Sequence, residues 1–419
     1  MSPPRAELRI DDLASPVLSD FQKSALAWSE QNPVVFSESA VLAAACRRTG
    51  LSDFGPGDFR ARLAVWLTAA DEDAGLHALG RHGLFQSCVR YLANRLRFTD
   101  LWTRHPEIAE IEIERPIIVV GLPRSGTTHL VNLIAADARL RSLPYWESLE
   151  PIPVPGEGPG RDGRDPRWTR CKRSYDMQVA QAPLVVAMHD MPPEHIHEEI
   201  ELQELDFASY QLEWLCRPPR WRDFYLSLDQ RPHYAYLKRV LKALTFLRGP
   251  RRWVLKSPQH LEQLVPLLAT FPDATIAVTH RDPVSVIRSA ITMLGYGDRM
   301  RRSELDLPGL AAYWIDRVER LLRACVRDRE KLPAEQSIDV PFDAFMAGDV
   351  AMVERIYAKA GLGMTDKVRR ELERFVGENP RGKHGQVVYD LRRDFGLDAS
   401  EVRKRFDFYF ERFAVKAED

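Results

Sequence analysis

The chain has 419 residues, 45% of them hydrophobic, which is enough to bury a large core. Its 59 basic and 60 acidic residues give a formal net charge of -1, which argues against a nucleic acid as the main partner, because binding its backbone needs a basic excess. The five cysteines are widely spaced without a Cys-x-x-Cys pair, so we expect free, buried thiols instead of a disulfide framework or a structural zinc site.

The N-terminal region, residues 1–110, is predicted to be largely helical. Phe59, Leu63, Trp66 and Leu67 recur at three- and four-residue spacing, which is typical of a helix packed on one face. The first residues lack the apolar block of a signal peptide. Because no run approaches the roughly 18 apolar residues of a membrane span, we predict a cytoplasmic protein without such a span.

From residue 111 to 419 the pattern is that of an α/β domain. Residues 116–120 form a short apolar run, typical of a strand buried on both faces of a parallel sheet. Further strands are expected at residues 253–255, 275–279 and 337–340, with helical patterns at 261–268 and 284–294, an exposed Pro- and Gly-rich loop at 151–166, and mainly helices after 307. This alternation predicts a P-loop-like parallel sheet flanked by helices, with right-handed crossovers.

A phosphate-binding loop is expected directly after the first strand. The sequence Gly121-Leu122-Pro123-Arg124-Ser125-Gly126-Thr127-Thr128 joins that strand to a segment of helical composition. A strand, a glycine-containing turn and a helix N-terminus together present backbone N–H groups and the positive end of the helix dipole to an anion. The glycine spacing matches that of nucleotide triphosphatases, but Thr127 stands where their lysine would be, and Arg124 supplies the cation instead.

The missing lysine bears on which functions are possible. A phosphotransferase or nucleotide hydrolase built on this loop needs Mg²⁺ and a nucleotide triphosphate, and no magnesium-binding carboxylate is evident. A nucleotide with fewer phosphates, bound without metal, fits the loop better. A non-catalytic nucleotide-binding protein is a further hypothesis, favoured only if the remaining candidate residues lie far from the loop.

The loop resembles the 5′-phosphosulfate loop of sulfotransferases that use 3′-phosphoadenosine 5′-phosphosulfate (PAPS). In residues 280–289 an arginine ends an expected strand and a serine follows eight residues later, as in that family's 3′-phosphate segment. Residues 379–385 resemble the basic glycine loop that closes over the nucleotide, although their order departs from the usual Arg-Lys-Gly. The resemblance covers residues 115–385 and is closer to the bacterial branch with a Trp-Val-Leu-Lys-Ser-Pro segment, here residues 253–258.

This resemblance implies an enzyme that moves a sulfuryl group from PAPS to a hydroxyl or amine of a small-molecule or lipid acceptor, without a metal. The residues implied to contact the donor are Arg124, Ser125, Gly126, Thr127, Thr128, Arg281, Ser289, Arg381, Gly382 and Lys383. An arginine gives phosphate a bidentate contact that a lysine cannot copy. The sequence leaves the acceptor and the oligomeric state open.

Three histidines and three glutamates lie within the eleven residues 189–199. By resemblance to the bacterial branch, which often carries an acidic run here, Glu198 is the first choice for the general base. A glutamate acts as a base near neutral pH when burial or a neighbouring carboxylate raises its pKa, and Glu194 and Glu199 are such neighbours. His197 is the alternative, because histidine titrates near neutral pH without further help.

Lys256 ends an expected strand, and open α/β sheets bind ligands beyond the carboxyl ends of their strands. We therefore assign Lys256, together with Arg124, to the transferring sulfuryl group and the bridging oxygen. His195 and Glu199 are four residues apart and would share one face of a helix, as metal ligands can. The segment has no His-Glu-x-x-His string, however, so we predict no metal site.

Overall fold

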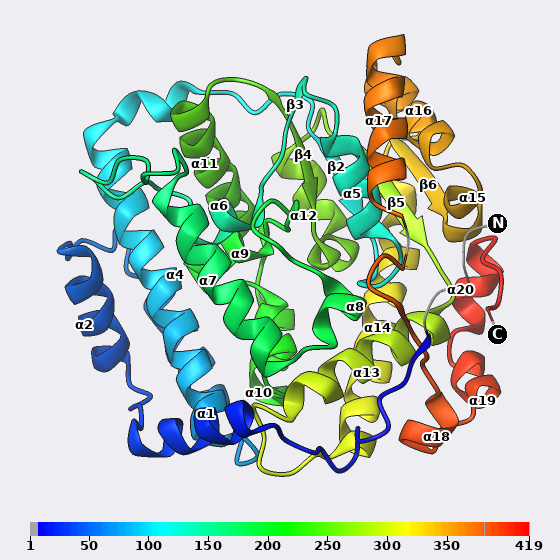
Figure 1. Ribbon diagram of the computed structural model, residues 1–419. Helices are drawn as coiled ribbons and strands as arrows, with labels where there is room; N and C mark the ends of the chain where they lie inside the picture. The colour runs from blue at the N-terminus through cyan, green and yellow to red at the C-terminus, as the bar shows by residue number, and fades with distance from the viewer. Residues whose placement is uncertain (1–6, 381, 419) are drawn as a thin grey trace.

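A parallel five-stranded sheet lies in the middle of the computed structural model, which describes residues 7–380 and 382–418 (Figure 1). The strands, in the spatial order β3-β4-β2-β5-β6, are β2 (Ile117–Val120), β3 (Leu140–Arg141), β4 (Arg252–Lys256), β5 (Thr275–His280) and β6 (Ser337–Pro341). The expected α/β fold is confirmed, and every strand predicted from the sequence is present. The strand β3 was not predicted, because a run of two residues carries no recognisable pattern.

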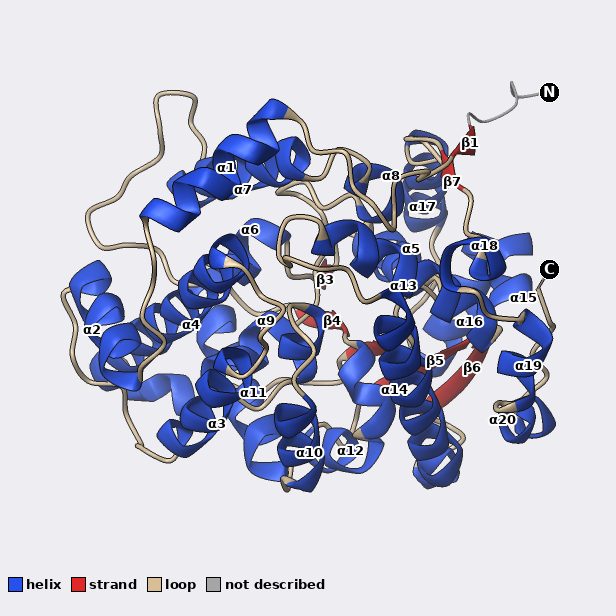
Figure 2. Ribbon diagram, turned by 90° about the horizontal axis from the view of Figure 1, so that it is seen from below, coloured by secondary structure: helices blue, strands red, loops and turns tan. Residues whose placement is uncertain are grey.

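The sheet is buried on both faces, as the continuous apolar run of β2 indicates. Ile117 and Val119 belong to one hydrophobic cluster, whereas Ile118 and Val120 belong to the other, because successive side chains of a strand point to opposite faces. Helices α5 (Thr127–Ala135), α16 (Asp349–Ala360) and α17 (Asp366–Glu378) cover one face, and α13 (Pro283–Asp298) and α14 (Leu307–Asp328) cover the other. Figure 2 shows the strands running between these helical layers.

The N-terminal region is helical, as predicted. Its helices are α1 (Asp20–Gln31), α2 (Glu38–Thr49), α3 (Phe59–Asp71) and α4 (Ala78–Arg104). Phe59, Leu63, Trp66 and Leu67 are all buried, so the periodicity of α3 correctly marked its inner face. The hydrophobic cluster that contains Trp66 continues into α13 and α14, so these helices pack against the sheet-bearing part. A domain boundary near residue 110 stays a prediction.

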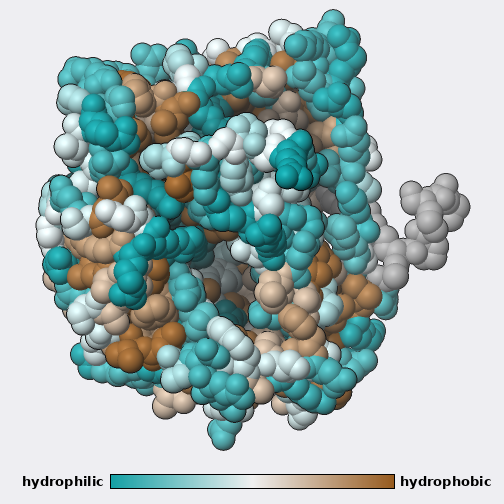
Figure 3. Space-filling view, turned by 60° about the vertical axis from the view of Figure 1, so that its left-hand side comes forward, coloured by the Kyte–Doolittle hydropathy of each residue, from teal (hydrophilic) through white to brown (hydrophobic). Residues whose placement is uncertain are grey.

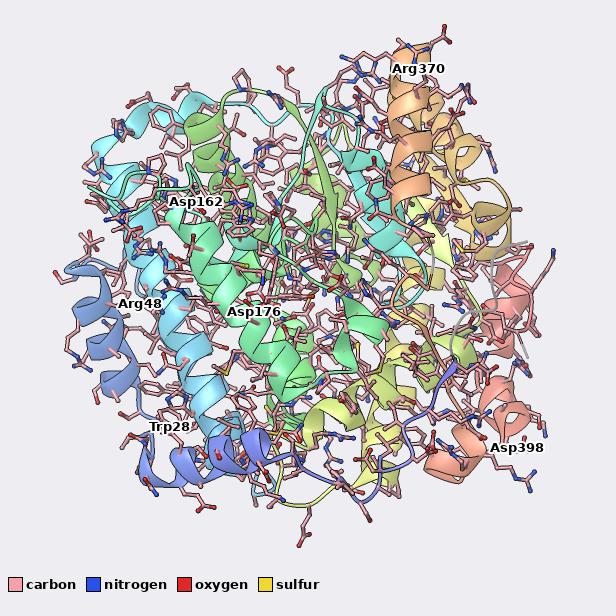
Figure 4. All side chains as sticks on the ribbon, in the orientation of Figure 1. Trp28, Arg48, Asp162, Asp176, Arg370 and Asp398 are labelled. Carbon is pink, nitrogen blue, oxygen red and sulfur yellow. The ribbon has the colours of Figure 1, made fainter. Side chains whose placement is uncertain are left out.

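The chain between β3 and β5 is mostly helical apart from β4, and its helix α7, which carries Asp176, lies at the front of the molecule in Figure 4. Its α-helices are α6 (Tyr145–Leu149), α7 (Pro166–Gln181), α8 (Val185–His189), α9 (Ile200–Gln203), α10 (Pro219–Ser227), α11 (Arg231–Arg248) and α12 (Leu264–Thr270). The described residues between α6 and α7 form the expected loop, which contains exposed Asp162 (Figure 4). The helix expected at 261–268 is divided, because a 3-10 helix (Pro258–Glu262) precedes α12.

The C-terminal segment packs beside the sheet at the β6 side (Figure 1). Its helices are α15 (Phe342–Ala347), α18 (Leu391–Phe395), α19 (Ala399–Lys404) and α20 (Asp407–Arg412). The short strands β1 (Glu7–Leu8) and β7 (Gln386–Val387) pair in parallel and join the start of the described chain to the C-terminal segment. The helix α19 packs on α13, and α20 packs on α14.

All five cysteines are free thiols, of which four are buried and Cys46 is partly buried. Burial raises the pKa of the Cys171 thiol to about 12, which leaves it protonated and unreactive near neutral pH. Within residues 7–380 and 382–418, no helix combines the length and the apolar composition needed to cross a membrane.

Candidate active site

The loop between β2 and α5 is built for close approach of a ligand to the backbone. A Cβ atom on Gly121 would lie 1.9 Å from the Thr279 hydroxyl of the neighbouring strand, so only glycine fits there. The Ser125 hydroxyl donates to the Leu122 carbonyl at 2.6 Å and lies 2.7 Å from the Thr279 hydroxyl. Gly126 has a φ of 87° and precedes the first residue of α5, so the loop ends on a helix N-terminus whose first N–H groups lack intrahelical partners.

Arg124 connects this loop to the two residues expected to bind the far phosphate. Its φ of 68° is unfavourable for a residue with a side chain, a kind of strain that concentrates at functional sites. The Arg124 side chain donates to the Ser289 hydroxyl at 3.0 Å, and the Arg124 carbonyl accepts from Arg281 at 2.7 Å. The structure therefore brings Arg124, Arg281 and Ser289 together, although Arg281 and Ser289 lie more than two helical turns apart along the chain.

Arg281 follows the last residue of β5, and its guanidinium holds a carboxylate. Nε donates to one oxygen of Glu418 at 2.7 Å, and Nη2 donates to the other at 2.6 Å. The guanidinium also lies over the Phe342 ring, 3.9 Å from its centroid. Asp282, the neighbour with which a surface arginine would pair, instead caps α13 and accepts from Arg403. The forked end of Arg281 is therefore an anion-binding group.

Lys256 connects the general-base candidate to the phosphate loop. Its side chain is only 1% exposed at the carboxyl end of β4. The ammonium contacts the Glu198 carboxylate and lies 3.3 Å from the Thr128 hydroxyl. Thr128, Lys256 and Glu198 thus form a contiguous row from the N-terminus of α5 to the acidic segment. The hypothesis of a non-catalytic protein required these residues to be remote from the loop, and they are not.

Glu199 fixes the position of Lys256 from the other side, a role that the sequence analysis missed. Its buried carboxylate accepts from the Lys256 backbone N–H at 2.8 Å and lies 2.6 Å from Nε2 of His260. Nδ1 of His260 lies 2.7 Å from the Tyr234 hydroxyl. The Glu199 carboxylate, the His260 ring and the Tyr234 hydroxyl therefore all have partners. Adjacent glutamates therefore hold one lysine, Glu198 by its ammonium and Glu199 by its backbone. The only signal in the sequence was the Glu-Glu pair itself.

The acidic segment lies directly ahead of a helix, since residues 190–199 are not helical and α9 begins at Ile200. The consecutive prolines at 192 and 193 disfavour a helix in the residues that precede them. His195 and Glu199 therefore do not share a helical face. Glu194 is exposed and accepts from the Trp168 indole at 2.7 Å. Among the described residues, no group of three His, Cys, Asp or Glu side chains is placed to hold a metal ion.

A cavity of about 330 Å³ lies beside Thr128 and Glu198. Its lining includes Arg124, Thr127, Thr128, Glu198 and His197, together with Arg90 and Tyr91 from α4, so the N-terminal region forms one of its walls. The space-filling view shows a hollow near the centre of one face, amid mixed polar and apolar side chains (Figure 3). The cavity is therefore a candidate site for an acceptor next to the phosphate loop.

His197 lies against this cavity and keeps both ring nitrogens without a hydrogen-bond partner among the described residues. Its Nε2 lies 3.9 Å from Glu201, which forms an ion pair with Arg90 at 2.9 Å. Burial works to raise the pKa of Glu201, but the positive charge of Arg90 and the contact with His197 outweigh it and lower that pKa to about 2. Glu201 is therefore ionised and unsuited to accept a proton.

The neighbouring imidazoles stay neutral near neutral pH. Burial, followed by the nearby His195, Arg124 and Lys256, holds the pKa of His189 well below the usual value. Burial, followed by His197 and Lys256, lowers the pKa of His195 in the same way. The positive charge beside the loop therefore comes from Arg124 and Lys256, not from these histidines.

The basic glycine loop is only partly within the described chain. Arg381 lies outside the described residues. Gly382 has a φ of 69° in a turn, and Lys383 is exposed. The next residue, His384, lies 3.2 Å from Asp190 and so connects this turn to the segment that carries His189. A nucleotide contact by this loop stays a prediction.

Comparison with known proteins agrees with this geometry. A sequence model described as "Sulfotransferase family" matches residues 116–366, which include the phosphate loop, Lys256 and Arg281. A crystal structure of a sulfotransferase from Mycobacterium tuberculosis H37Rv shares 28% identity and a TM-score of 0.77, over 88% of this chain and 98% of that one. A sulfotransferase from Mycobacterium avium has the same fold at 23% identity, with a TM-score of 0.81 over 92% of this chain and 98% of that one. No curated protein sequence matches significantly.

Proposed function

This chain belongs to the sulfotransferase family and is a sulfotransferase, and we propose that its sulfuryl donor is PAPS. In this proposal the 5′-phosphosulfate end lies on the loop from Gly121 to Thr128, and the 3′-phosphate lies at Arg281 and Ser289. The observation that carries the proposal is the direct contact of Arg124 with both Arg281 and Ser289. One arginine of the loop thus touches both members of the distal phosphate pair.

The described residues suit such a donor chemically. The loop ends at a helix N-terminus that no side chain caps, and Gly121 allows the backbone to approach closely. The carboxylate of Glu418, held by Nε and Nη2 of Arg281, stands in for a phosphate at that position. A carboxylate and a phosphate present similar paired oxygens to a guanidinium, so the same fork serves both.

Lys256 and Arg124 are proposed to stabilise the charge that develops during transfer. PAPS supplies a sulfuryl group joined to the 5′-phosphate by a phosphosulfate anhydride. The Lys256 ammonium, beside Thr128 at the start of α5, neutralises the oxygen that bridges sulfur and phosphorus as negative charge accumulates there. Fixed donors of this kind need little reorganisation during the reaction, because β4 and Glu199 hold Lys256 in place.

Glu198 is proposed to act as the general base, with His197 as the alternative. Glu198 accepts the proton of the acceptor hydroxyl or amine while the acceptor atom bonds to sulfur, the bond from sulfur to the 5′-phosphate oxygen breaks, and that oxygen keeps the electron pair. Before transfer, Glu198 is paired with Lys256. Engagement of Lys256 by the donor would release the carboxylate, so the base becomes available when the donor is bound.

The remaining assignments complete the proposal. Arg381, Gly382 and Lys383 are proposed to close over the nucleotide, supported by the link between His384 and Asp190. The acceptor is proposed to be a small molecule that enters the cavity walled by α4. On the sequence alone we also propose a cytoplasmic location and a division of the chain into a helical region, residues 1–110, and an α/β domain, residues 111–419.

Transfer of labelled sulfate tests the proposal. The protein is incubated with PAPS carrying sulfur-35 and a panel of phenols, alcohols and amines, with EDTA present. The expected result is a labelled product together with stoichiometric 3′-phosphoadenosine 5′-phosphate (PAP). Release of label only as inorganic sulfate, or transfer that requires Mg²⁺, would contradict it.

A further inference from the structure

The last described residues of the chain end on the phosphate-binding arginine. Residues 414–418 run back from α20 to the carboxyl end of β5, at the side of the molecule where α18, α19 and α20 lie (Figure 1). There the Glu418 carboxylate accepts from Nε and Nη2 of Arg281, at 2.7 and 2.6 Å. Both side chains are mostly shielded, with 21% of Arg281 and 28% of Glu418 exposed.

Specific contacts hold this tail in place. The Glu418 backbone N–H donates to the Asp282 carboxylate at 2.8 Å, and the same oxygen accepts from Arg403 of α19 at 2.8 Å. Arg403 also donates to the Glu418 carbonyl at 3.0 Å. Two residues earlier, Lys416 pairs with Asp343 of α15. The backbone and side chain of Glu418 are thus both positioned, so its contact with Arg281 does not rest on one flexible side chain.

This contact uses the hydrogen bonds that a phosphate would need. Of the five N–H groups of the Arg281 guanidinium, one on Nη1 donates to the Arg124 carbonyl, and the edge formed by Nε and Nη2 is taken by Glu418. The 3′-phosphate of a donor and the carboxylate of Glu418 therefore cannot both occupy this edge of Arg281. Binding of one requires the other to leave.

We propose that residues 414–418 form an autoinhibitory tail whose Glu418 carboxylate occupies the 3′-phosphate position and is displaced by the donor. The inference rests on the proposed function of Arg281. An ion pair that keeps some exposure is weak enough for a phosphate to displace it. Only protein molecules with a displaced tail bind the 3′-phosphate. The apparent dissociation constant of the donor therefore equals the intrinsic one divided by the fraction of molecules whose tail is displaced.

The tail also distinguishes nucleotides by their 3′ position. A nucleotide without a 3′-phosphate reaches the phosphate loop without needing the fork of Arg281, so the tail can stay in place. The competition therefore applies to PAP and PAPS and not to 5′-AMP. Affinity for PAP alone should respond to changes in Glu418.

The test compares the whole protein with Glu418→Gln, which keeps the size of the side chain and removes its charge. Glu411→Gln is the matched control, because Glu411 is exposed on α20 and the change in net charge is the same. Calorimetric titration with PAP should give a dissociation constant about two- to tenfold lower for Glu418→Gln than for wild type and the control. Titration with 5′-AMP should give equal values for all three proteins.

Hydrogen–deuterium exchange of the wild-type tail gives a second readout. Saturating PAP should speed exchange at residues 414–418 while it slows exchange at residues 121–128. Equal PAP affinity in the three proteins, or slower exchange of the tail with PAP bound, would overturn the autoinhibitory role of the tail and leave the proposed donor standing. If no protein binds PAP, the proposed donor fails and this inference fails with it.

Discussion

Replacing Glu198 by glutamine separates its proposed catalytic role from its contact with Lys256. Glutamine keeps the shape of the side chain and an oxygen that can still accept from the ammonium, but it cannot take up a proton at neutral pH. Glu198 contacts neither Arg281 nor Ser289 in any interaction that the described residues show. Donor binding should therefore survive the change, and turnover should not.

The expected magnitudes follow from the burial of the pair. Loss of a positioned general base lowers kcat by about 10²- to 10⁴-fold. A pair of unit charges about 3 Å apart interacts by about 5 kcal/mol at an effective dielectric constant of about 20. Lys256 is 1% exposed and Glu198 is 15% exposed. Glu198→Gln therefore leaves a buried ammonium without the negative charge that balanced it, and we expect the free energy of unfolding to fall by about 3 kcal/mol.

Three variants isolate the effect. Glu194→Gln is the control, since Glu194 is an exposed glutamate in the same segment, bonded to Trp168. The double variant Glu198→Gln with Lys256→Met removes both charges, so it should recover much of the lost stability while remaining inactive. The assay is kcat with labelled PAPS and the best acceptor of the panel, with PAP affinity by calorimetry and unfolding in urea measured in parallel.

Glu198 is not the general base if Glu198→Gln is folded, binds PAP normally and keeps kcat within about threefold of wild type, because a positioned base contributes far more than that. In that case His197→Asn should show the loss instead. A large fall in PAP affinity in Glu198→Gln would also contradict the account, since it would place Glu198 in the donor site.

Three further changes test other parts of the structure. Gly121→Ala places a Cβ 1.9 Å from the Thr279 hydroxyl, so we expect loss of PAP binding and about 1–3 kcal/mol of stability in urea unfolding; normal binding would show that the loop tolerates a side chain. Because the pKa of His195 is lowered in the fold, the unfolded chain binds more protons than the folded one below about pH 6.5. Between pH 7.5 and 5.5 the free energy of unfolding should therefore fall by roughly 1 kcal/mol more in wild type than in His195→Asn. Equal losses in the two proteins would exclude a buried neutral imidazole. Arg317→Met leaves two buried carboxylates without their partner and should cost about 3–5 kcal/mol by urea unfolding, whereas a cost below 1 kcal/mol would contradict this.

The sheet and the phosphate loop could be predicted because their signals are local. Residues 117–120 are apolar without interruption, since β2 is buried on both faces, and the glycines at 121 and 126 stand where a side chain would collide or a positive φ is required. The helix caps also depend on neighbours in sequence, since the side chains of Asp282 and Ser257 each accept from the backbone N–H two residues later. Such features depend on a few consecutive residues.

Contacts between distant parts of the chain could not be predicted. Glu418 and Arg281 are separated by 137 positions, and no pattern in either segment indicates the other. The pairing of Glu199 with His260 and the wall that α4 contributes to the cavity depend in the same way on packing.

Binding of PAP with EDTA present, compared with 5′-AMP and with ATP plus Mg²⁺, tests the central claim most directly when wild type and Arg281→Ala are measured side by side. Wild type is expected to bind PAP without metal and more tightly than either other nucleotide. Arg281→Ala should lose about ten- to a hundredfold in PAP affinity, since a bidentate charged contact is removed, and nothing in 5′-AMP affinity. Tighter binding of ATP that depends on Mg²⁺, or equal PAP affinity in the two proteins, would contradict the central claim.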